Sequence, residues 1–428
     1  MTEMRDFAIF TMLLSFAMLA MYRPWLGVLG LAILSYMHPQ GYALGFAKHI
    51  PVFLILFGVV SLSTVTHYVR TRPSYTLPFD WRLVFLIALW LWFGVSSYFA
   101  IFPSGALEKY IDVLKILPPL LLTLLLIDGR EKLRYLMITI VVAILIVAVK
   151  GGYWAVINGF HDRVYGPPGS PYADNNEFAV VVSMVIPLLF LWLRESKDKL
   201  LRMVIMGGIL LCYGSVISSW SRGGMLALFV VTLMLLWHSK KKLLAVPFLV
   251  IVLAGFFVQL PGNWFERMET LSAVEQDASA QSRLAVWRIG REFVLHHPVT
   301  GGGFDAWPAL TLSTGGPLDW HSAYVEMATE HGLVGLAIWS LLLFGTLASL
   351  TRLGVTAARK GLTWAADYAA MIRASLMAYM VGGLTLGIAY WELPYHLIMI
   401  AIVLGEIVTK GIFDKNETGI DQNSSKSG

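Results

Sequence analysis

Residues 136–157 are LMITIVVAILIVAVKGGYWAVI, a run of 22 residues in which Lys150 is the only charged side chain. A helix of ~20 apolar residues spans the hydrocarbon core of a bilayer and satisfies its backbone hydrogen bonds internally. Strands of a membrane barrel would alternate between apolar and polar residues, and this run does not alternate. The stretch therefore predicts a transmembrane helix.

The same pattern recurs along the chain. Of the 428 residues, 57% are hydrophobic and 14% are charged, whereas roughly 25% of the residues in a soluble domain are charged. Thirteen apolar runs are separated by polar breaks: 7–22, 25–37, 51–69, 83–101, 113–127, 136–157, 178–193, 203–218, 225–237, 243–258, 333–350, 374–390 and 397–408. We expect an all-α polytopic membrane protein with about 12 transmembrane helices and one large, partly helical periplasmic loop.

Basic residues lie in alternate loops, near Arg70, Arg130, Arg194, Lys241, Arg352 and Lys410. The positive-inside rule predicts that these loops are cytoplasmic. Two separate crossings by 7–22 and 25–37 would place the amino terminus outside, whereas one kinked crossing around Pro24, or one re-entrant run, would place it inside. We expect 12 crossings with both termini in the cytoplasm.

These assignments divide the chain into four segments: a transmembrane bundle at 1–258, a large periplasmic loop at 259–332, the final transmembrane helices at 333–410 and a cytoplasmic tail at 411–428. The tail is polar, which predicts disorder. The periplasmic loop carries many large aromatic side chains: Trp264, Phe265, Trp287, Phe293, Phe304, Trp307 and Trp320. This composition predicts that the loop folds against the membrane or the bundle.

Several function classes find no support in the composition. The net charge of +5 resides in the loops between apolar runs, where topology accounts for it, so we expect no nucleic-acid partner. The single cysteine, Cys212, lies in an apolar run and has a packing role. His331 follows His321 by ten positions, which is not a recognised metal-ligand spacing. We therefore expect no metal and no cofactor.

Residues 282–297 of the periplasmic loop have the periodicity of an amphipathic helix, with Ser282 as its possible cap. One face carries three apolar side chains: Val286, Ile289 and Phe293. The opposite side carries Arg283, Trp287 and Arg291, with Arg288 at its edge. This pattern suits guanidinium groups that face a polar space, and it equally suits arginines that contact lipid headgroups or carboxylates.

Three outward segments carry further candidates. His321-Ser322 lies where the chain re-enters the membrane, a position that also suits an ordinary interfacial histidine. Arg222 occupies a tight turn between two apolar runs, where it is either functional or a snorkelling side chain. The 161–177 loop contains Arg163 and the sequence Asp174-Asn175-Asn176, of which Asp174 or an asparagine is expected to cap the next helix.

Four features of these segments occur together: the Ser221-Arg222-Gly223 turn, Ser282-Arg283 with Trp287, the glycines Gly301–Gly303, and His321-Ser322 followed after nine residues by Gly332 and then by Gly335. In this combination the chain resembles the O-antigen ligase family of bacterial envelopes, whose loop motif is matched throughout. The resemblance implies metal-independent, inverting transfer of a polysaccharide from undecaprenyl pyrophosphate to a hydroxyl of the lipid A-core oligosaccharide. It places the reaction at the periplasmic face of the inner membrane.

The resemblance also implies roles for individual residues. His321 corresponds to the catalytic histidine, and the implied substrate-binding residues are Arg222, Arg283, Arg163, Arg288, Asn176 and Ser322. An acidic residue that the family carries late in the chain has no motif match, and Glu392 in the last outward link is the nearest candidate.

Other functions remain compatible with the sequence. An O-antigen polymerase and a protein O-oligosaccharyltransferase use the same carrier and share much of this region. A transporter of lipid-linked sugars belongs to a different class, for which charges at mid-membrane and repeated halves are expected. Lys150, the main charge within a run, lies toward its outer end, and no repeat is evident.

Overall fold

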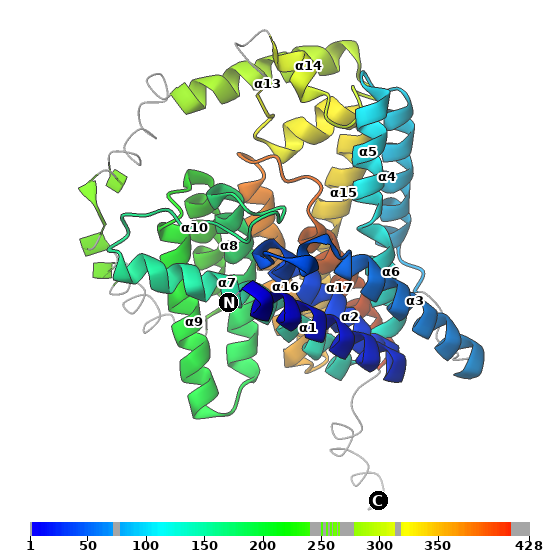
Figure 1. Cartoon of the computed structure of the whole chain (residues 1–428), viewed down its shortest axis with the longest axis vertical. Coiled ribbons are helices and arrows are strands. Elements are labelled where there is room, and N and C mark those ends of the chain that lie inside the picture. The colour runs from blue at the N-terminus through cyan, green and yellow to red at the C-terminus, as the bar shows by residue number, and fades with distance from the viewer. Residues whose placement is uncertain are drawn as a thin grey trace, which may run out of the picture.

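The computed structural model describes residues 2–71, 78–239, 250, 254–255, 257–258, 260–262, 264–265, 278–312 and 318–411. Most of these residues lie in helices, and no strand occurs among them (Figure 1). Eight of the described helices are long and apolar enough to cross a membrane, and α2 and α10 are shorter apolar helices. Residues 412–428 and most of the apolar run 243–258 lie outside the described part, as do 266–277 and 313–317 of the expected loop.

The first two apolar runs form separate helices, α1 (Thr2–Tyr22) and α2 (Pro24–Met37), that fold back on each other. Pro24 begins α2, which suits proline because the first residue of a helix needs no amide donor. Glycines allow the close approach: a Cβ at Gly30 would lie 2.6 Å from the Phe16 ring. The two runs therefore do not form the kinked single crossing that we considered.

Two ends of the bundle can be distinguished. The loop end carries residues 158–174, 218–222 and 383–391, and the basic end carries Arg82, Arg130 and Lys410. The short 3-10 helices η1 (Pro39–Tyr42) and η2 (Phe46–His49) follow α2 at the loop end, since Gly41 packs against the backbone of Pro168.

The amino end of α1 lies at this same loop end, because the ring of Phe7 lies 5.7 Å from that of Phe46 in η2. Helix α17 instead runs toward the basic end, where Gly405 lies near Arg82. The expectation that both ends of the chain lie on one side is therefore wrong for the helices described. Because α1 and α2 form a hairpin, the chain changes direction once more than it would in a single crossing.

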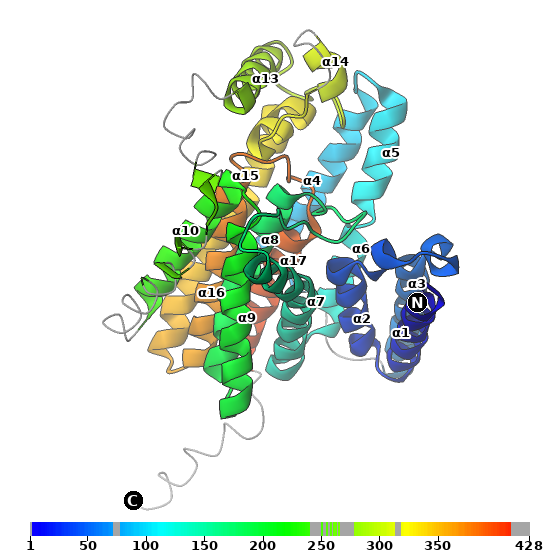
Figure 2. The same ribbon diagram turned by 60° about the vertical axis from the view of Figure 1, so that its left-hand side comes forward.

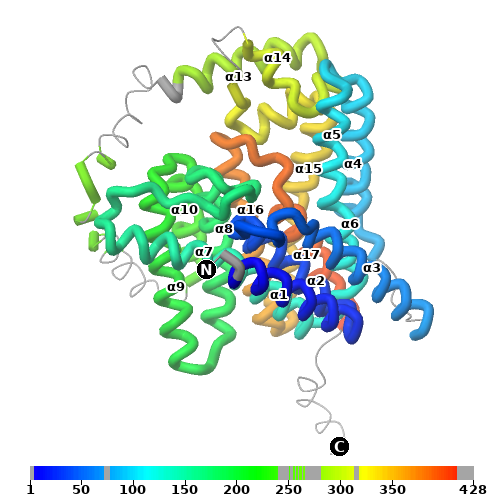
Figure 3. The backbone as a smooth tube through the Cα atoms, in the orientation of Figure 1, coloured from blue at the N-terminus to red at the C-terminus, as the bar shows by residue number. Residues whose placement is uncertain are grey.

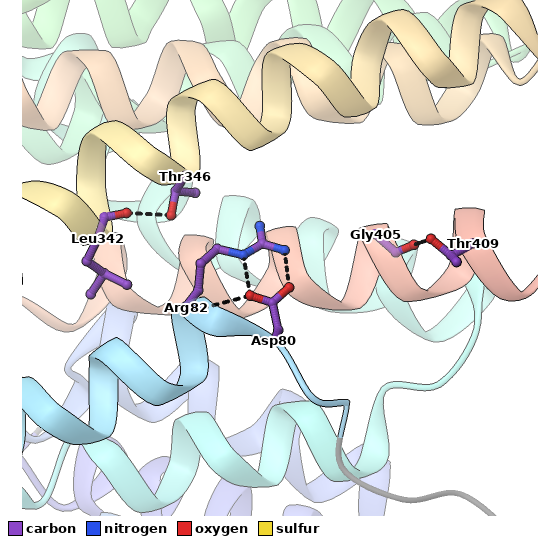
Figure 4. Close-up of polar contacts among 6 residues, drawn as sticks. All are labelled: Asp80, Arg82, Leu342, Thr346, Gly405 and Thr409. Carbon is purple, nitrogen blue, oxygen red and sulfur yellow. Dashed lines mark hydrogen bonds and ion pairs between the residues drawn. The ribbon is translucent and has the colours of Figure 1, made fainter.

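Helix α3 (Val52–Thr71) leads to α4 (Trp81–Tyr98), which Asp80 caps at the basic end. Figure 4 shows Asp80 in a bidentate ion pair with Arg82, whose Nη2 lies 2.6 Å from Oδ2. The run 113–127 is not one helix but the end of α5 (Pro103–Leu114) and α6 (Leu117–Leu126). Two prolines at the start of α6 lack amide donors, which explains the interruption.

Four helices follow: α7 (Arg130–Ile157), α8 (Asn175–Glu195), α9 (Lys199–Ile217) and α10 (Arg222–His238). Helix α8 is the most enclosed of them and packs against α7, α9 and α10. Figure 2 shows α9 and α10 on one side of the molecule and α1 to α3 on the other. At the loop end, residues 158–174 join α7 to α8 and a short turn at 218–221 joins α9 to α10. The two connections lie against each other, since the Val164 amide donates to the Ser218 carbonyl at 3.1 Å.

Three helices follow beyond the residues left undescribed: α13 (Ala278–His296), α14 (Trp307–Thr311) and α15 (Ala323–Arg359). Helix α13 starts four residues before the expected cap, so Ser282 lies inside it. The buried residues of α13 are Val286, Gly290 and Val294. The expected apolar face was Val286, Ile289 and Phe293, so the second and third positions are shifted by one residue. Figure 1 shows α13 and α14 at the top of the molecule, above the start of α15.

Helices α16 (Thr363–Gly382) and α17 (Glu392–Lys410) complete the bundle. The apolar run 374–390 is not continuous helix, because α16 ends at Gly382 and 383–391 form an irregular segment, the last link. Figure 3 shows this link, in orange, passing between the start of α15 and the region of α8 and α10. It therefore connects the parts of the loop end that carry the candidate site.

Candidate functional site

His321 lies on the irregular segment before α15, half-buried, in the left-handed backbone region with φ 47°. The next two residues attach this segment to the last link: the Ala323 amide donates to the Gly383 carbonyl at 2.8 Å, and Ser322 Oγ donates to the same oxygen at 3.4 Å. Because Ser322 is buried and hydrogen-bonded in this way, its hydroxyl holds the turn that presents His321.

Helix α13 packs over this turn. The indole nitrogen of Trp287 donates to the Trp320 carbonyl at 2.7 Å, and a Cβ at Gly290 would lie 3.1 Å from the Trp320 ring. Arg283 lies one helical turn before Trp287, and its charge lowers the pKa of His321. Arg288, in contrast, is exposed on α13.

The start of α8 forms another wall. Asp174 caps this helix by accepting hydrogen bonds from the backbone and side-chain nitrogens of Asn176, both at 2.9 Å. Burial raises the pKa of Asp174, but hydrogen bonds from Asn176, Glu177 and Asn175 together outweigh that effect and hold the pKa below its usual value. Asp174 is therefore ionised at neutral pH, and its charge raises the pKa of His321.

The 219–222 turn lies directly against the start of α8, since Asn175 Nδ2 donates to the Ser219 carbonyl at 2.7 Å. Ser221 caps α10 by accepting from the Gly224 amide at 3.0 Å, which makes Arg222 the first residue of that helix. Arg222 is half-buried at this position.

Arg163 joins the same turn, since its guanidinium lies over the Trp220 ring at 5.6 Å. The last link connects this turn to that of His321, because Gly383 accepts from Ala323 and Thr385 packs against Gly223. The structure thus groups His321, Ser322, Arg283 and the start of α8, with Arg222 and Arg163 on the adjoining turn.

Three influences other than Arg283 also act on His321. Burial of the imidazole is the largest and lowers its pKa, while the carboxylates of Asp319 and Asp174 raise it. The net effect is a pKa below the usual value of ~6.5. The imidazole is therefore neutral at pH 7 and can accept a proton.

The glycine-rich segment 301–303 has a structural role. Its amides donate to the carbonyls of His297, Thr329 and Glu330, at 3.3, 2.8 and 2.8 Å respectively. Because these donors are already engaged, the segment does not present them to a phosphate. Gly332 adopts φ 67° inside α15, and this break lets the Leu333 amide donate to the Pro298 carbonyl at 2.7 Å.

Two other residues, the rejected metal ligand His331 and the doubtful acidic candidate Glu392, belong to hydrogen-bond networks away from His321. His331 lies between Ser96 Oγ, 2.6 Å from Nδ1, and the Tyr390 hydroxyl, 2.8 Å from Nε2. Glu392 accepts from Ser35 and, at 3.5 Å, from Tyr36. Neither residue is among the groups whose charge acts on His321.

Asp319 was not identified from the sequence. It precedes His321 by two residues, and its carboxylate lies against Gly387 of the last link. The proximity to His321 along the chain was a signal, but an acidic residue in a loop is common and this one matched no motif. The place of its carboxylate against Gly387 depends on how the last link folds.

Two family models match parts of the chain. Residues 207–340 match the family model described as O-Antigen ligase, a segment that extends from α9 into α15 and includes Arg222, Arg283 and His321. Residues 4–198 match a Family of unknown function (DUF5935). No curated protein gives a significant match to the chain.

Proposed function

Because residues 207–340 assign the chain to the O-antigen ligase family of membrane glycosyltransferases, we propose that it transfers a polysaccharide from undecaprenyl pyrophosphate to a hydroxyl of lipid A-core oligosaccharide. The helices span the bacterial inner membrane, and the reaction takes place at the loop end, on the periplasmic side. The observation that carries this proposal is the grouping of His321, just before α15, with Arg283 of α13, and of Arg222 and Arg163 on the adjoining turn.

The arginines bind the pyrophosphate of the donor. A guanidinium group is always charged and forms two parallel hydrogen bonds to phosphate oxygens. Negative charge accumulates on the bridging oxygen as the glycosidic bond breaks, so the contacts from Arg222 and Arg283 strengthen in the transition state. Differential stabilisation of this kind accelerates the chemical step. The leaving group needs no proton, and the arginines supply the positive charge without a metal ion.

His321 acts as the general base. It takes the proton of the acceptor hydroxyl while that oxygen attacks the anomeric carbon, and the electron pair of the broken bond leaves with the pyrophosphate. The lowered pKa of His321 keeps the imidazole in its neutral, proton-accepting form at pH 7. A single displacement inverts the anomeric carbon without a covalent enzyme intermediate.

Reconstituted transfer tests this function. The purified protein in lipid nanodiscs receives the lipid-linked polysaccharide and lipid A-core, with EDTA and without ATP, and the products are separated by size. We expect a lengthened lipopolysaccharide with the wild type and none with His321→Ala at equal folding and yield. No product with either protein, using donor and acceptor from the native host, would refute the proposal.

Two related reactions are outcomes of a complementary test. Deletion of a ligase leaves core without polysaccharide, whereas deletion of a polymerase leaves core capped with one repeat unit. Loss of a protein O-oligosaccharyltransferase leaves a bare glycoprotein. The reaction proposed here is that of the ligase, so we expect uncapped core.

A further inference from the structure

Asp319 is fixed between two segments of the loop end. Its Oδ1 accepts the Trp320 amide at 2.7 Å, and Trp320 itself is fully buried under α13. On its other side the carboxylate faces the last link: a Cβ at Gly387 would lie 3.1 Å from Oδ2 and 3.4 Å from Oδ1. The side chain of Asp319 therefore occupies the space that a side chain at position 387 would fill.

The charged groups around His321 come from three elements. Asp319 belongs to the segment before α15, Arg283 to α13, and Asp174 to the cap of α8. Among these charges Asp319 has the largest effect on the pKa of His321, which it raises, followed by Arg283, which lowers it, and Asp174, which raises it. Glu177 and Glu326 in turn lie within electrostatic range of Asp319.

We propose that Asp319 is a positioning residue for the transfer reaction, held against Gly387 so that its carboxylate stabilises the imidazolium of His321. The proposal rests on the proposed function, in which His321 receives the proton of the acceptor hydroxyl. The proton stays on the imidazole until the product leaves. A fixed carboxylate beside a base favours the protonated base as it forms in the transition state.

Removal of this carboxylate is expected to shift the pKa of His321 in a definite direction. Asp319→Asn lowers the pKa of His321 further, and it slows transfer by roughly tenfold or more because the imidazolium loses its counter-charge. Arg283→Gln shifts the pKa in the opposite direction. A purely structural role for Asp319 predicts lower yield or stability, but no such pair of opposed shifts.

The titration of His321 is measured directly by NMR on protein labelled with 15N-histidine in nanodiscs. The His321 signal is assigned by its absence in His321→Gln. We expect the pKa to fall in Asp319→Asn, to remain near the wild-type value in Asp319→Glu, and to rise in Arg283→Gln. Asp305→Asn is the matched control, since Asp305 is a half-buried aspartate whose charge acts on Glu326 and Glu330, and it is not among the groups that act on His321.

A second variant keeps the proposal testable if Asp319→Asn does not fold. Gly387→Ala changes no charge, but its methyl group displaces the Asp319 carboxylate by a few tenths of an ångström. We expect a smaller fall in the His321 pKa, and no additional effect of Gly387→Ala in an Asp319→Asn background. An unchanged pKa in both single variants, or an equal fall in Asp305→Asn, would overturn the proposal.

The titration separates this inference from the proposed function. If the wild type transfers no polysaccharide yet the His321 pKa responds to Asp319→Asn, the function is wrong and the pairing of the two side chains stands. If the wild type transfers polysaccharide and the pKa does not respond, the role of Asp319 is wrong and the function stands.

Discussion

Gly332 and Val299 are in backbone contact that leaves no room for a side chain. A Cβ at Gly332 would lie 2.5 Å from the Val299 carbonyl carbon and 2.8 Å from the Pro298 carbonyl oxygen. Gly332 also has φ 67°, a conformation that residues with a side chain rarely adopt. The glycine therefore permits both the break in α15 and the attachment of the segment that follows α13.

Gly332→Ala is expected to destabilise the loop end. A non-glycine residue in this conformation costs about 1–3 kcal/mol, and the overlap with Val299 adds to that cost. We expect a lower unfolding midpoint in detergent and slower transfer, because α13 and Arg283 lose their support. Gly354→Ala in the same helix is the control, since its Cβ would make ordinary contact at 3.7 Å. Equal midpoints for the two variants would contradict this account.

The pH dependence of transfer follows from His321. Burial, the largest influence, lowers its pKa, and Arg283 acts in the same direction against the opposing carboxylates of Asp319 and Asp174. A base works in its neutral form, so the rate declines only as the pH falls through the lowered pKa. We expect the acid limb of kcat/KM to lie below pH ~6.5. An acid limb at neutral pH or above would contradict the assignment.

Substitution of the partly buried Arg222 or Arg283 is expected to impair transfer more than substitution of an exposed arginine. Arg222→Ala and Arg283→Ala each lose a charge-assisted hydrogen bond of about 1.5–3 kcal/mol, which corresponds to a kcat/KM for the donor roughly 10- to 100-fold lower. Lysine should restore part of this loss, because it lacks the planar fork. Assays at pH 8 keep His321 neutral in every variant. Arg291→Ala, exposed on α13, is the control, and an equal effect there would indicate general electrostatics.

Apolar runs locate long helices well, because a membrane helix must be apolar over most of its length. The run 136–157 lies wholly within α7, and 178–193 within α8. The same measure missed the end of α16 at Gly382, because the last link is as apolar as the helix before it. Hydropathy reports composition, whereas that end is fixed by contacts with α15 and α10.

Part of the candidate site could be predicted from the sequence. His321, Arg222 and Arg283 stand in motifs whose spacing is visible along the chain. Asp319 was missed because its position depends on Gly387, far away in the sequence. The amino end of α1 was placed on the wrong side because positive charge could not decide whether α1 and α2 cross separately.

Glu392 is a candidate for function by its position in the sequence, but its contacts in the fold indicate a structural role. Its carboxylate joins α17 to α2 through Ser35 and Tyr36, and the Tyr36 hydroxyl lies 2.7 Å from Nδ1 of His396. Tyr172 of the outward loop donates to the Tyr36 carbonyl. These contacts make Glu392 a structural link between the first helices and the last.

Glu392→Gln is therefore expected to lower stability and leave the chemistry intact. The amide offers one acceptor where the carboxylate offers two, so the free energy of unfolding falls by about 1 kcal/mol. We expect kcat within about threefold of the wild type and an unchanged acid limb, since Glu392 is not among the groups that act on His321. Glu108→Gln on the exposed side of α5 controls for the substitution itself. A large loss of kcat with an unchanged unfolding midpoint would show that Glu392, rather than Asp319, is the carboxylate that supports transfer.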